Sequence, residues 1–314
     1  MPTIFLAIAF LWIFLGQAFA QQPAASQEPV FQEGEAPPIR VLVEEVNVQF
    51  IVTDKKGRLI TDLNAEDFRV LEEKQPQEII AFSRESDVPL RIGLLVDTSN
   101  SIRDRFGFEQ RAAAEFLRSL LRFGKDQAFL GSFDSMAELV QDFTDDIDKL
   151  VSAVESLRPG GGTALYDAIY FGSKNKMMDE AYPASQIRRT MVVLSDGEDN
   201  QSRSTRFQAL EMAQRAGVIL YTISTNIRGI PFPGDKVLKL FAEETGGRFF
   251  QPHNMGDLSR AFEEINMELR SQYSISYRST MPRDGTYHEI EIIPQKKDMR
   301  VRARRGYFAE KPPG

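Results

Sequence analysis

Cysteine is absent from this chain of 314 residues, and histidine occurs only twice. The lack of cysteine excludes disulfides, thiol catalysis, cysteine-based zinc sites and an N-terminal lipid-modified cysteine. A basic excess is missing as well: the formal net charge is −7, so the composition does not indicate a nucleic-acid-binding protein. Solubility is sufficient to explain a mildly acidic surface. Core packing, rather than cross-links, is expected to stabilise the fold.

The N-terminus combines a short apolar run with a small-residue cleavage signal. The run extends from Ile4 to Leu15, which is shorter than a typical membrane-spanning helix, and Ala18-Phe19-Ala20 follows it. Lysine and arginine are missing here, so only the amino terminus carries positive charge. We predict that residues 1–20 form a cleaved signal peptide. The mature protein would then be periplasmic, extracellular or envelope-associated, with no stable membrane span. The alternative is an uncleaved anchor, which would also export the rest of the chain.

Two β-rich segments flank the middle of the chain. Residues 21–38, rich in Gln, Pro, Glu and Ala, precede the first of them and are predicted to form a disordered linker. Residues 39–87 begin with near-alternation of apolar and polar side chains and continue with two short strand patterns; residues 271–310 contain three more. Each segment has too few strands for a closed sandwich. We therefore predict that the two pair into one discontinuous β-sandwich.

The intervening residues 88–270 alternate strand and helix patterns. A continuous apolar run from Leu90 to Val96 is typical of a strand that is buried on both faces. Apolar residues then recur at helical spacing over 108–123, and the alternation continues to a last helix at 255–271. The pattern predicts an α/β fold, in which a doubly wound, mainly parallel sheet is flanked by helices and inserted in the small discontinuous β-sandwich.

Three polar loops interrupt this alternation. They read Asp97-Thr98-Ser99-Asn100-Ser101, Gly160-Gly161-Gly162-Thr163 and Ser195-Asp196-Gly197-Glu198-Asp199. Ligands of open α/β sheets bind beyond the carboxyl ends of the strands, so we expect the three loops at one edge of the sheet. Carboxylate and hydroxyl oxygens suit Mg²⁺ or Mn²⁺. With few carboxylates around it, such a cation can accept a further carboxylate from a partner.

The three loops resemble the metal-ion-dependent adhesion site of von Willebrand factor A (VWA) domains, in the same chain order. The resemblance implies a bound divalent metal, Mg²⁺ with Mn²⁺ or Ca²⁺ as alternatives. The implied ligands are Ser99, Ser101 and Thr163 directly, and Asp97 and Asp196 directly or through water. The usual pattern has glycine where this chain has Asn100, a change that does not remove a ligand. A capped helix start without metal is the alternative interpretation of the first loop.

The resemblance to VWA domains covers about residues 88–270. The whole chain further resembles the VWA-related family common in Acidobacteria, on the flanking segments 41–87 and 273–308. This second resemblance supports the fold more than a function, because little is understood of what that family does.

Acidic residues beside the loops carry weaker signals. Glu198 and Asp199 could tune the charge of the metal site, although a solvated loop is the simpler interpretation. Asp134 either supports the site or caps a turn.

Two histidines and a row of arginines are the remaining candidate functional groups. His253 and His288 lack partners at metal-ligand spacing, so surface or packing roles are predicted. Alternation places Arg300, Arg302 and Arg304 on one face of a strand. An exposed charged sheet surface is the first interpretation, and contact with anionic lipid or polysaccharide is the second.

The leading functional hypothesis is an exported binding protein, not an enzyme, that uses its metal to capture an Asp or Glu carboxylate of a protein partner. Nucleic acid is not an expected partner. One alternative is a structural component of the cell envelope in which the metal only stabilises the loops. A metal-dependent hydrolase is the other alternative, but the chain lacks both the Gly-x-Ser-x-Gly and the His-Glu-x-x-His motifs.

Overall fold

The fold is that of a computed structural model, which describes residues 45–84, 87–103, 106–178, 186–226 and 232–311. The predicted signal peptide and linker lie outside the described residues. Within the described ranges, no helix combines the length and the apolar character needed to cross a membrane.

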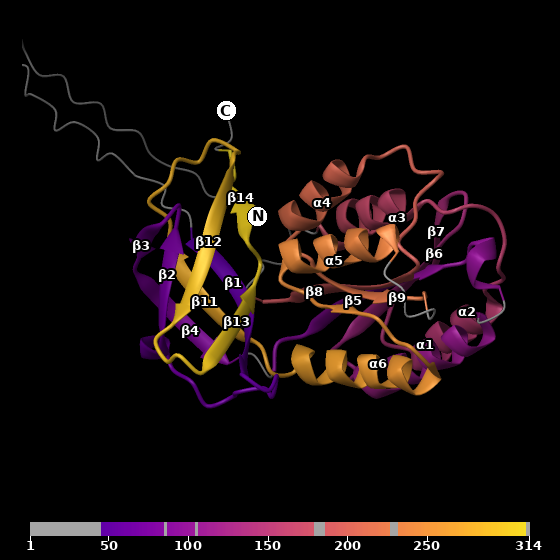
Figure 1. The fold of residues 1–314 in the computed structure, drawn as a ribbon, viewed down its shortest axis with the longest axis horizontal. Helices are drawn as coiled ribbons and strands as arrows, with labels where there is room; N and C mark the ends of the chain where they lie inside the picture. The colour runs from indigo at the N-terminus through magenta and orange to yellow at the C-terminus, as the bar shows by residue number, and fades with distance from the viewer. Residues whose placement is uncertain (1–44, 85–86, 104–105, 179–185, 227–231, 312–314) are drawn as a thin grey trace, which may run out of the picture. The chain divides into compact units, whose positions relative to one another are not determined.

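A six-stranded sheet forms the centre of the α/β domain (Figure 1). Its strand order is β10-β9-β8-β5-β6-β7, and all pairs are parallel except β6 with β7. The strands are β5 (Leu90–Asp97), β6 (Gln127–Phe133), β7 (Ala137–Thr144), β8 (Arg188–Ser195), β9 (Ile219–Ser224) and β10 (Phe249–Phe250). The predicted mainly parallel sheet is confirmed. The antiparallel edge strand β7 is an element that the sequence pattern did not predict.

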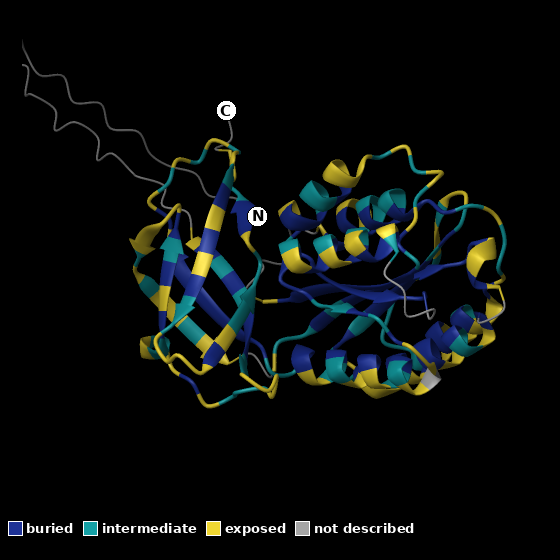
Figure 2. Cartoon of the chain, viewed as in Figure 1, coloured by how far each residue is buried: buried dark blue, intermediate teal, exposed yellow. Residues whose placement is uncertain are grey.

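Helices cover both faces of this sheet (Figure 1). On one face lie α1 (Phe106–Leu120), α2 (Ile147–Ser156) and α6 (Met255–Leu269); on the other lie α3 (Leu165–Phe171), α4 (Arg206–Arg215) and α5 (Pro233–Thr245). The central strand shows why both faces are apolar: Leu94 and Val96 face the first helix layer, and Leu95 faces the second. Strands β5, β8 and β9 are accordingly buried along almost their whole length (Figure 2).

The β segments at the two ends of the described chain form two four-stranded sheets, ordered β13-β1-β11-β4 and β14-β12-β2-β3. The strands are β1 (Glu45–Asp54), β2 (Phe68–Glu72), β3 (Gln75–Gln77), β4 (Ile79–Arg84), β11 (Tyr273–Arg278), β12 (Tyr287–Pro294), β13 (Met299–Ala303) and β14 (Gly306–Phe308). Strand β1 lies between β11 and β13, and β2 pairs with β12. One apolar core, containing Phe50, Phe68 and Tyr273, lies between the sheets. Strands from both ends of the sequence therefore build a single sandwich.

The arginines of β13 and the residues after it contact other parts of the chain instead of forming one exposed face. Arg302 forms an ion pair with Glu268 of α6, and its Nη1 donates to the carbonyl of Gly246 at 2.9 Å. Arg304 donates to the carbonyl of Asn47 at 2.9 Å. Only Arg300 of the three is exposed. The prediction of a continuous arginine surface is wrong, because alternation along a strand does not show what covers the face.

A buried carboxylate, Asp126, joins three elements of the α/β domain. Its side chain is fully buried and accepts hydrogen bonds from the amide of Leu90 at 3.0 Å, from Arg122 Nε at 3.0 Å and from Arg270 Nη2 at 2.6 Å. Leu90 begins β5, Arg122 follows α1 and Arg270 follows α6. Asp126 thus fixes one strand and two helix ends at the sheet edge where β5 starts.

Acid should weaken the fold partly through this residue. Burial alone would raise the pKa of Asp126, but hydrogen bonds from Arg122, Arg270 and the Leu90 amide outweigh burial and lower the pKa to about 2. A carboxyl group with a lowered pKa stabilises the folded state above its unfolded pKa, near 3.8, and that stabilisation is lost as the pH falls through about 2. The whole shift corresponds to about 2 kcal/mol.

We therefore expect Asp126→Asn to reduce the dependence of unfolding free energy on pH between about pH 4 and about pH 2. Urea titrations of the wild type and of Asp126→Asn over this pH range, followed by circular dichroism, measure this dependence. The two proteins have all their other carboxylates in common, so the difference between their curves of unfolding free energy against pH reports Asp126 alone. Parallel curves over this range would refute the assignment.

Candidate metal centre

The first loop (residues 97–101, loop 1) leaves the carboxyl end of β5. Asp97 is fully buried, and its Oδ1 accepts a hydrogen bond from the amide of Ser99 at 2.8 Å. A single 3-10 turn (Asn100–Ile102) follows and brings the hydroxyls of Ser99 and Ser101 to 2.9 Å from each other. Ser99 is buried and Ser101 is exposed. Loop 1 therefore presents two adjacent hydroxyl groups above a buried carboxylate.

The second loop (residues 160–163, loop 2) packs directly on loop 1. The amide of Gly160 donates to the carbonyl of Thr98 at 2.6 Å, and the side-chain amide of Asn100 donates to the carbonyl of Gly161 at 3.2 Å. Gly161 has a φ of +71°, and a Cβ there would lie 2.7 Å from the hydroxyl of Ser135. A side chain at this position would push the loop away, so glycine is needed for the close approach.

The third loop (residues 195–201, loop 3) contacts both of the others. Ser195 Oγ donates to Asp97 Oδ2 at 2.7 Å and accepts from the amide of Gly197 at 3.0 Å. The amides of Asn200 and Gln201 donate to the carbonyl of Thr163 at 3.0 and 3.1 Å. Hydrogen bonds thus join loop 1 to loop 2, loop 2 to loop 3 and loop 3 to loop 1. The structure brings together the three loops that the sequence predicted at one edge.

The electrostatics of the loops suit a cation. Burial raises the pKa of Asp97 to about 6, hydrogen bonds from Ser195 and Ser99 oppose this rise, and the negative charge of Asp196 adds to it. Two carboxylates therefore interact at this edge, one of them fully buried. A divalent cation would neutralise both.

The available donor atoms also fit a hard cation. Hydroxyl and carboxylate oxygens are the groups that Mg²⁺ and Mn²⁺ prefer. Among the residues that the structure describes, no three His, Cys, Asp or Glu side chains gather as metal ligands. The hydroxyls of Ser99, Ser101 and Thr163 are the further oxygen donors that these loops contain.

Residues 92–198 match the family model of the von Willebrand factor type A domain. This segment is therefore similar to VWA domains. The matched segment begins in β5 and ends within loop 3, so it includes loop 1, loop 2 and the part of loop 3 that contains Asp196. No curated protein sequence matches the chain.

Several solved structures have similar folds. Proximal thread matrix protein 1 from the mussel byssus, in a form with a zinc-occupied MIDAS motif, shares 15% identity and a TM-score of 0.50, over 64% of this chain and 50% of that one. The vWF domain of the type V pili tip protein Mfa5 from Porphyromonas gingivalis shares 15% identity and a TM-score of 0.48, over 58% and 95%.

The PilB minor pilin from Streptococcus sanguinis, as a D319A mutant, shares 14% identity and a TM-score of 0.48, over 60% of this chain and 62% of the pilin. The chain therefore spans less than two thirds of the pilin and half of the mussel protein. At these identities the likeness concerns the VWA fold alone.

The acidic residues beside the VWA loops have structural contacts. Asp199 accepts hydrogen bonds from the amide of Tyr166 at 3.0 Å and from the hydroxyl of Ser202 at 2.6 Å, so it holds the start of α3. Asp134 accepts from the amide of Met136 at 3.3 Å, as a turn cap does. Its carboxylate also lies 2.9 Å from where a Cβ of Gly161 would be, beside loop 2. Glu198 is exposed.

Neither histidine belongs to the three loops. His253 is exposed before α6. His288 is buried in the sandwich, with its ring centroid 5.7 Å from that of Tyr307. These positions agree with the predicted surface and packing roles.

Sequence reasoning gave Ser195 no role, yet its hydroxyl connects the buried carboxylate of loop 1 to the backbone of loop 3. Asn200 was likewise missed, although its Oδ1 accepts from the amide of Thr163 at 3.0 Å. The only sequence signal for Ser195 is its place directly before Asp196. Asn200 offers no such signal, because its partner is 37 residues away.

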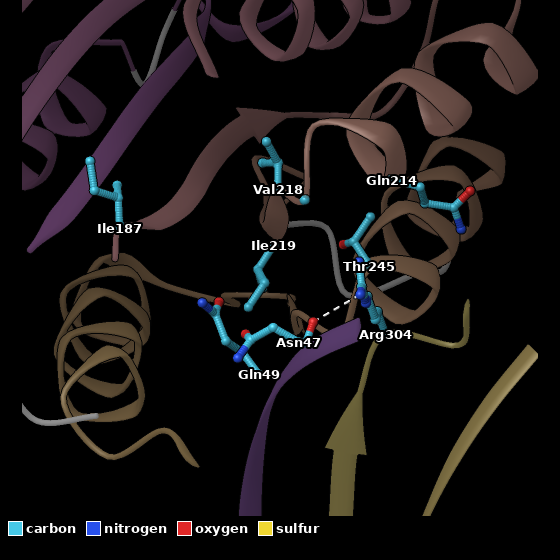
Figure 3. Close-up of a pocket in the computed structure, with 9 residues that line it drawn as sticks. Asn47, Gln49, Ile187, Gln214, Val218, Ile219, Thr245 and Arg304 are labelled. Carbon is cyan, nitrogen blue, oxygen red and sulfur yellow. Dashed lines mark hydrogen bonds between the residues drawn. The ribbon is translucent and has the colours of Figure 1, made fainter. Parts of the chain in front are cut away.

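A pocket of about 460 Å³, counting the solvent at its mouth, lies away from the VWA loops (Figure 3). Asn47 and Gln49 of β1 line it together with Val218 and Ile219, which lie at the start of β9. Loops 1 and 3 follow the other ends of the parallel strands β5 and β8, and loop 2 packs on loop 1. Arg304 also lines the pocket and is bonded there to the Asn47 carbonyl (Figure 3). The pocket is therefore separate from the candidate metal centre.

Proposed function

We propose that the VWA domain binds a divalent cation, Mg²⁺ with Mn²⁺ or Ca²⁺ as alternatives, at the junction of the three loops. The proposed ligands are Asp97, Ser99, Ser101, Thr163 and Asp196. The observation that carries the proposal is the closed set of hydrogen bonds that holds the loops against one another. Both Asp97 oxygens already accept hydrogen bonds, from Ser99 and Ser195. This favours contact of Asp97 with the cation through water.

We further propose that the cation captures an Asp or Glu carboxylate of a protein partner. Two aspartates offset the charge of a divalent cation without surrounding it, and Ser101 is exposed. A coordination position on that side is open to an external oxygen, which a carboxylate fills well. The mussel protein of similar fold has a zinc-occupied motif of this type, which is consistent with the metal but says nothing of the partner here.

Binding is favoured over catalysis by the residues around the loops. A hydrolase needs a positioned general base or nucleophile. Neither histidine lies in the loops, and the carboxylates of Asp134 and Asp199 are engaged by backbone amides. We therefore propose that the protein is not an enzyme. Export through residues 1–20 and the relation to the family common in Acidobacteria also stay predictions.

Metal binding is tested with Ser99→Ala and Asp97→Ala. Each change removes an oxygen from loop 1, so we expect the affinity for Mg²⁺ and Mn²⁺ to fall by at least about tenfold. Isothermal titration calorimetry measures the affinity. Ser156→Ala is the matched control, because the hydroxyl of this exposed serine of α2 donates to the carbonyl of Ala153 within the same helix. Unchanged affinity in both loop variants would reject the proposed ligands.

Partner capture is tested separately, by a pull-down from the native envelope in Mg²⁺ and in EDTA. We expect one or more proteins to be retained by the wild type in Mg²⁺ and lost with EDTA or with Asp97→Ala. If EDTA lowers the melting temperature but leaves every interaction intact, the metal is structural and the capture proposal fails.

A further inference from the structure

An exposed arginine, Arg103, lies two residues after the last predicted ligand of loop 1. Its Nη2 donates a hydrogen bond of 2.8 Å to Oδ1 of Asn100. Among the described residues it forms no ion pair. Its positive charge is therefore not neutralised by a neighbouring carboxylate of the described chain.

The partner of Arg103 is itself anchored. Asn100 donates to the carbonyl of Gly161 twice, from its side-chain amide at 3.2 Å and from its backbone amide at 3.4 Å. One asparagine thus bridges loop 1 and loop 2 and holds the guanidinium with its remaining oxygen. Asn100 lies between Ser99 and Ser101, and Gly161 lies two residues before Thr163. The guanidinium is accordingly held at the rim, next to three of the five proposed ligands.

The charge of Arg103 favours an anion on the loop 1 side of the site. A divalent cation together with ionised Asp97 and Asp196 sums to zero, and Glu198 and Asp199 leave loop 3 negative, so the loaded loops alone attract no anion over a distance. Arg103 adds a positive charge on the loop 1 side, and its guanidinium can donate two parallel hydrogen bonds to a carboxylate. The glycine that usually occupies position 100 could not hold an arginine in this way, since it has no side-chain oxygen.

We propose that Arg103 is a second anion contact beside the metal, so that the site selects ligands carrying two acidic groups. One carboxylate completes the metal coordination, and the other pairs with the guanidinium. This inference rests on the proposed metal-dependent capture and names its ligand class: a peptide segment with two neighbouring Asp or Glu residues. Arg103 acts on selectivity, and metal binding does not depend on it.

The test compares labelled pentapeptides that carry two glutamates, adjacent or separated by one or two glycines, with matched peptides in which one glutamate is glutamine. Fluorescence anisotropy in Mg²⁺, with a neutral dye, gives the affinities. For the best spacing, we expect the wild type to prefer the two-glutamate peptide about three- to tenfold. About twofold of this is statistical and the rest comes from an exposed ion pair. Arg103→Ala should reduce the preference to about the statistical twofold.

Two further variants sharpen the result. Asn100→Gly removes the anchor and should reduce the preference; because Asn100 also bonds loop 1 to loop 2, the Mg²⁺ affinity of this variant is measured as well and the peptides are compared at saturating Mg²⁺. Arg118→Ala removes another exposed arginine, near the far end of α1, and should change neither. The proposal is overturned if the wild type shows no preference beyond twofold at any spacing, or if Arg103→Ala keeps it. If the wild type does not bind Mg²⁺, the proposed function itself is overturned, and this inference with it.

Discussion

Replacement of Asp126 by alanine is expected to destabilise the protein by about 3–5 kcal/mol, the usual cost of removing one partner of a buried ionic cluster. The change leaves the buried amide of Leu90 without its acceptor and leaves Arg122 beside Arg270 without the carboxylate between them. Guanidinium or urea unfolding, followed by circular dichroism, measures the loss.

Asp87→Ala is the matched control for this experiment. Asp87 also pairs with Arg122, at 3.5 Å, but its side chain is 89% exposed. An exposed ion pair contributes at most about 1 kcal/mol. If the two substitutions cost the same, Asp126 is not the buried centre that the hydrogen bonds indicate.

Gly197→Ala is expected to disrupt loop 3 and with it metal binding. Gly197 has a φ of +79°, and a Cβ there would lie 2.2 Å from the carbonyl oxygen of Gly234 in α5. The atoms that this Cβ would meet belong to the backbone of Gly234, so the loop or the helix must move. Displacing the loop also displaces Asp196, the neighbour of Gly197. We expect Mg²⁺ affinity to fall by at least about tenfold and stability to fall by more than the φ strain of about 1–2 kcal/mol.

Gly57→Ala is the control that separates backbone strain from the steric contact of a new Cβ. Its φ is +80°, nearly the same, but a Cβ there meets no atom within 4 Å. It should cost only the backbone strain and leave Mg²⁺ affinity unchanged. Equal stability losses for the two alanines, with metal binding intact in both, would contradict the close contact between loop 3 and α5.

The sheet was predictable from sequence because its strands are buried on both faces. A continuous apolar run such as Leu90 to Val96, set between helical patterns, is typical of a central strand in an α/β sheet. Strand β7 was not predicted because it lies at the edge of the sheet, where its side chains are only partly covered. Its residues are half-buried or exposed, so the segment contains no apolar run. β-Propensity and alternation are weak signals for such an edge strand.

The three loops of the candidate site were predictable for a different reason. Each loop is a short motif whose carboxylate, hydroxyl or glycine residues are close together in the sequence, around Asp97, Thr163 and Asp196. What joins the loops was not predictable. Ser195 and Asn200 bond to residues 98 and 37 positions away, and no local pattern specifies such a contact. The prediction of an exposed arginine face was wrong for the same reason, since Arg302 forms an ion pair with Glu268 of α6.

The discontinuous sandwich has a consequence for the order of events during synthesis. Strand β1 has a buried apolar face, and its two neighbours in the sheet are β11 and β13, more than 200 residues further along the chain. Closing so long a loop before the intervening domain folds is entropically unfavourable. While the ribosome is still making the α/β domain, β1 has no neighbour and its edges are open to other chains. We expect nascent chains that stop before residue 273 to aggregate through this strand, even when their α/β portion has already formed.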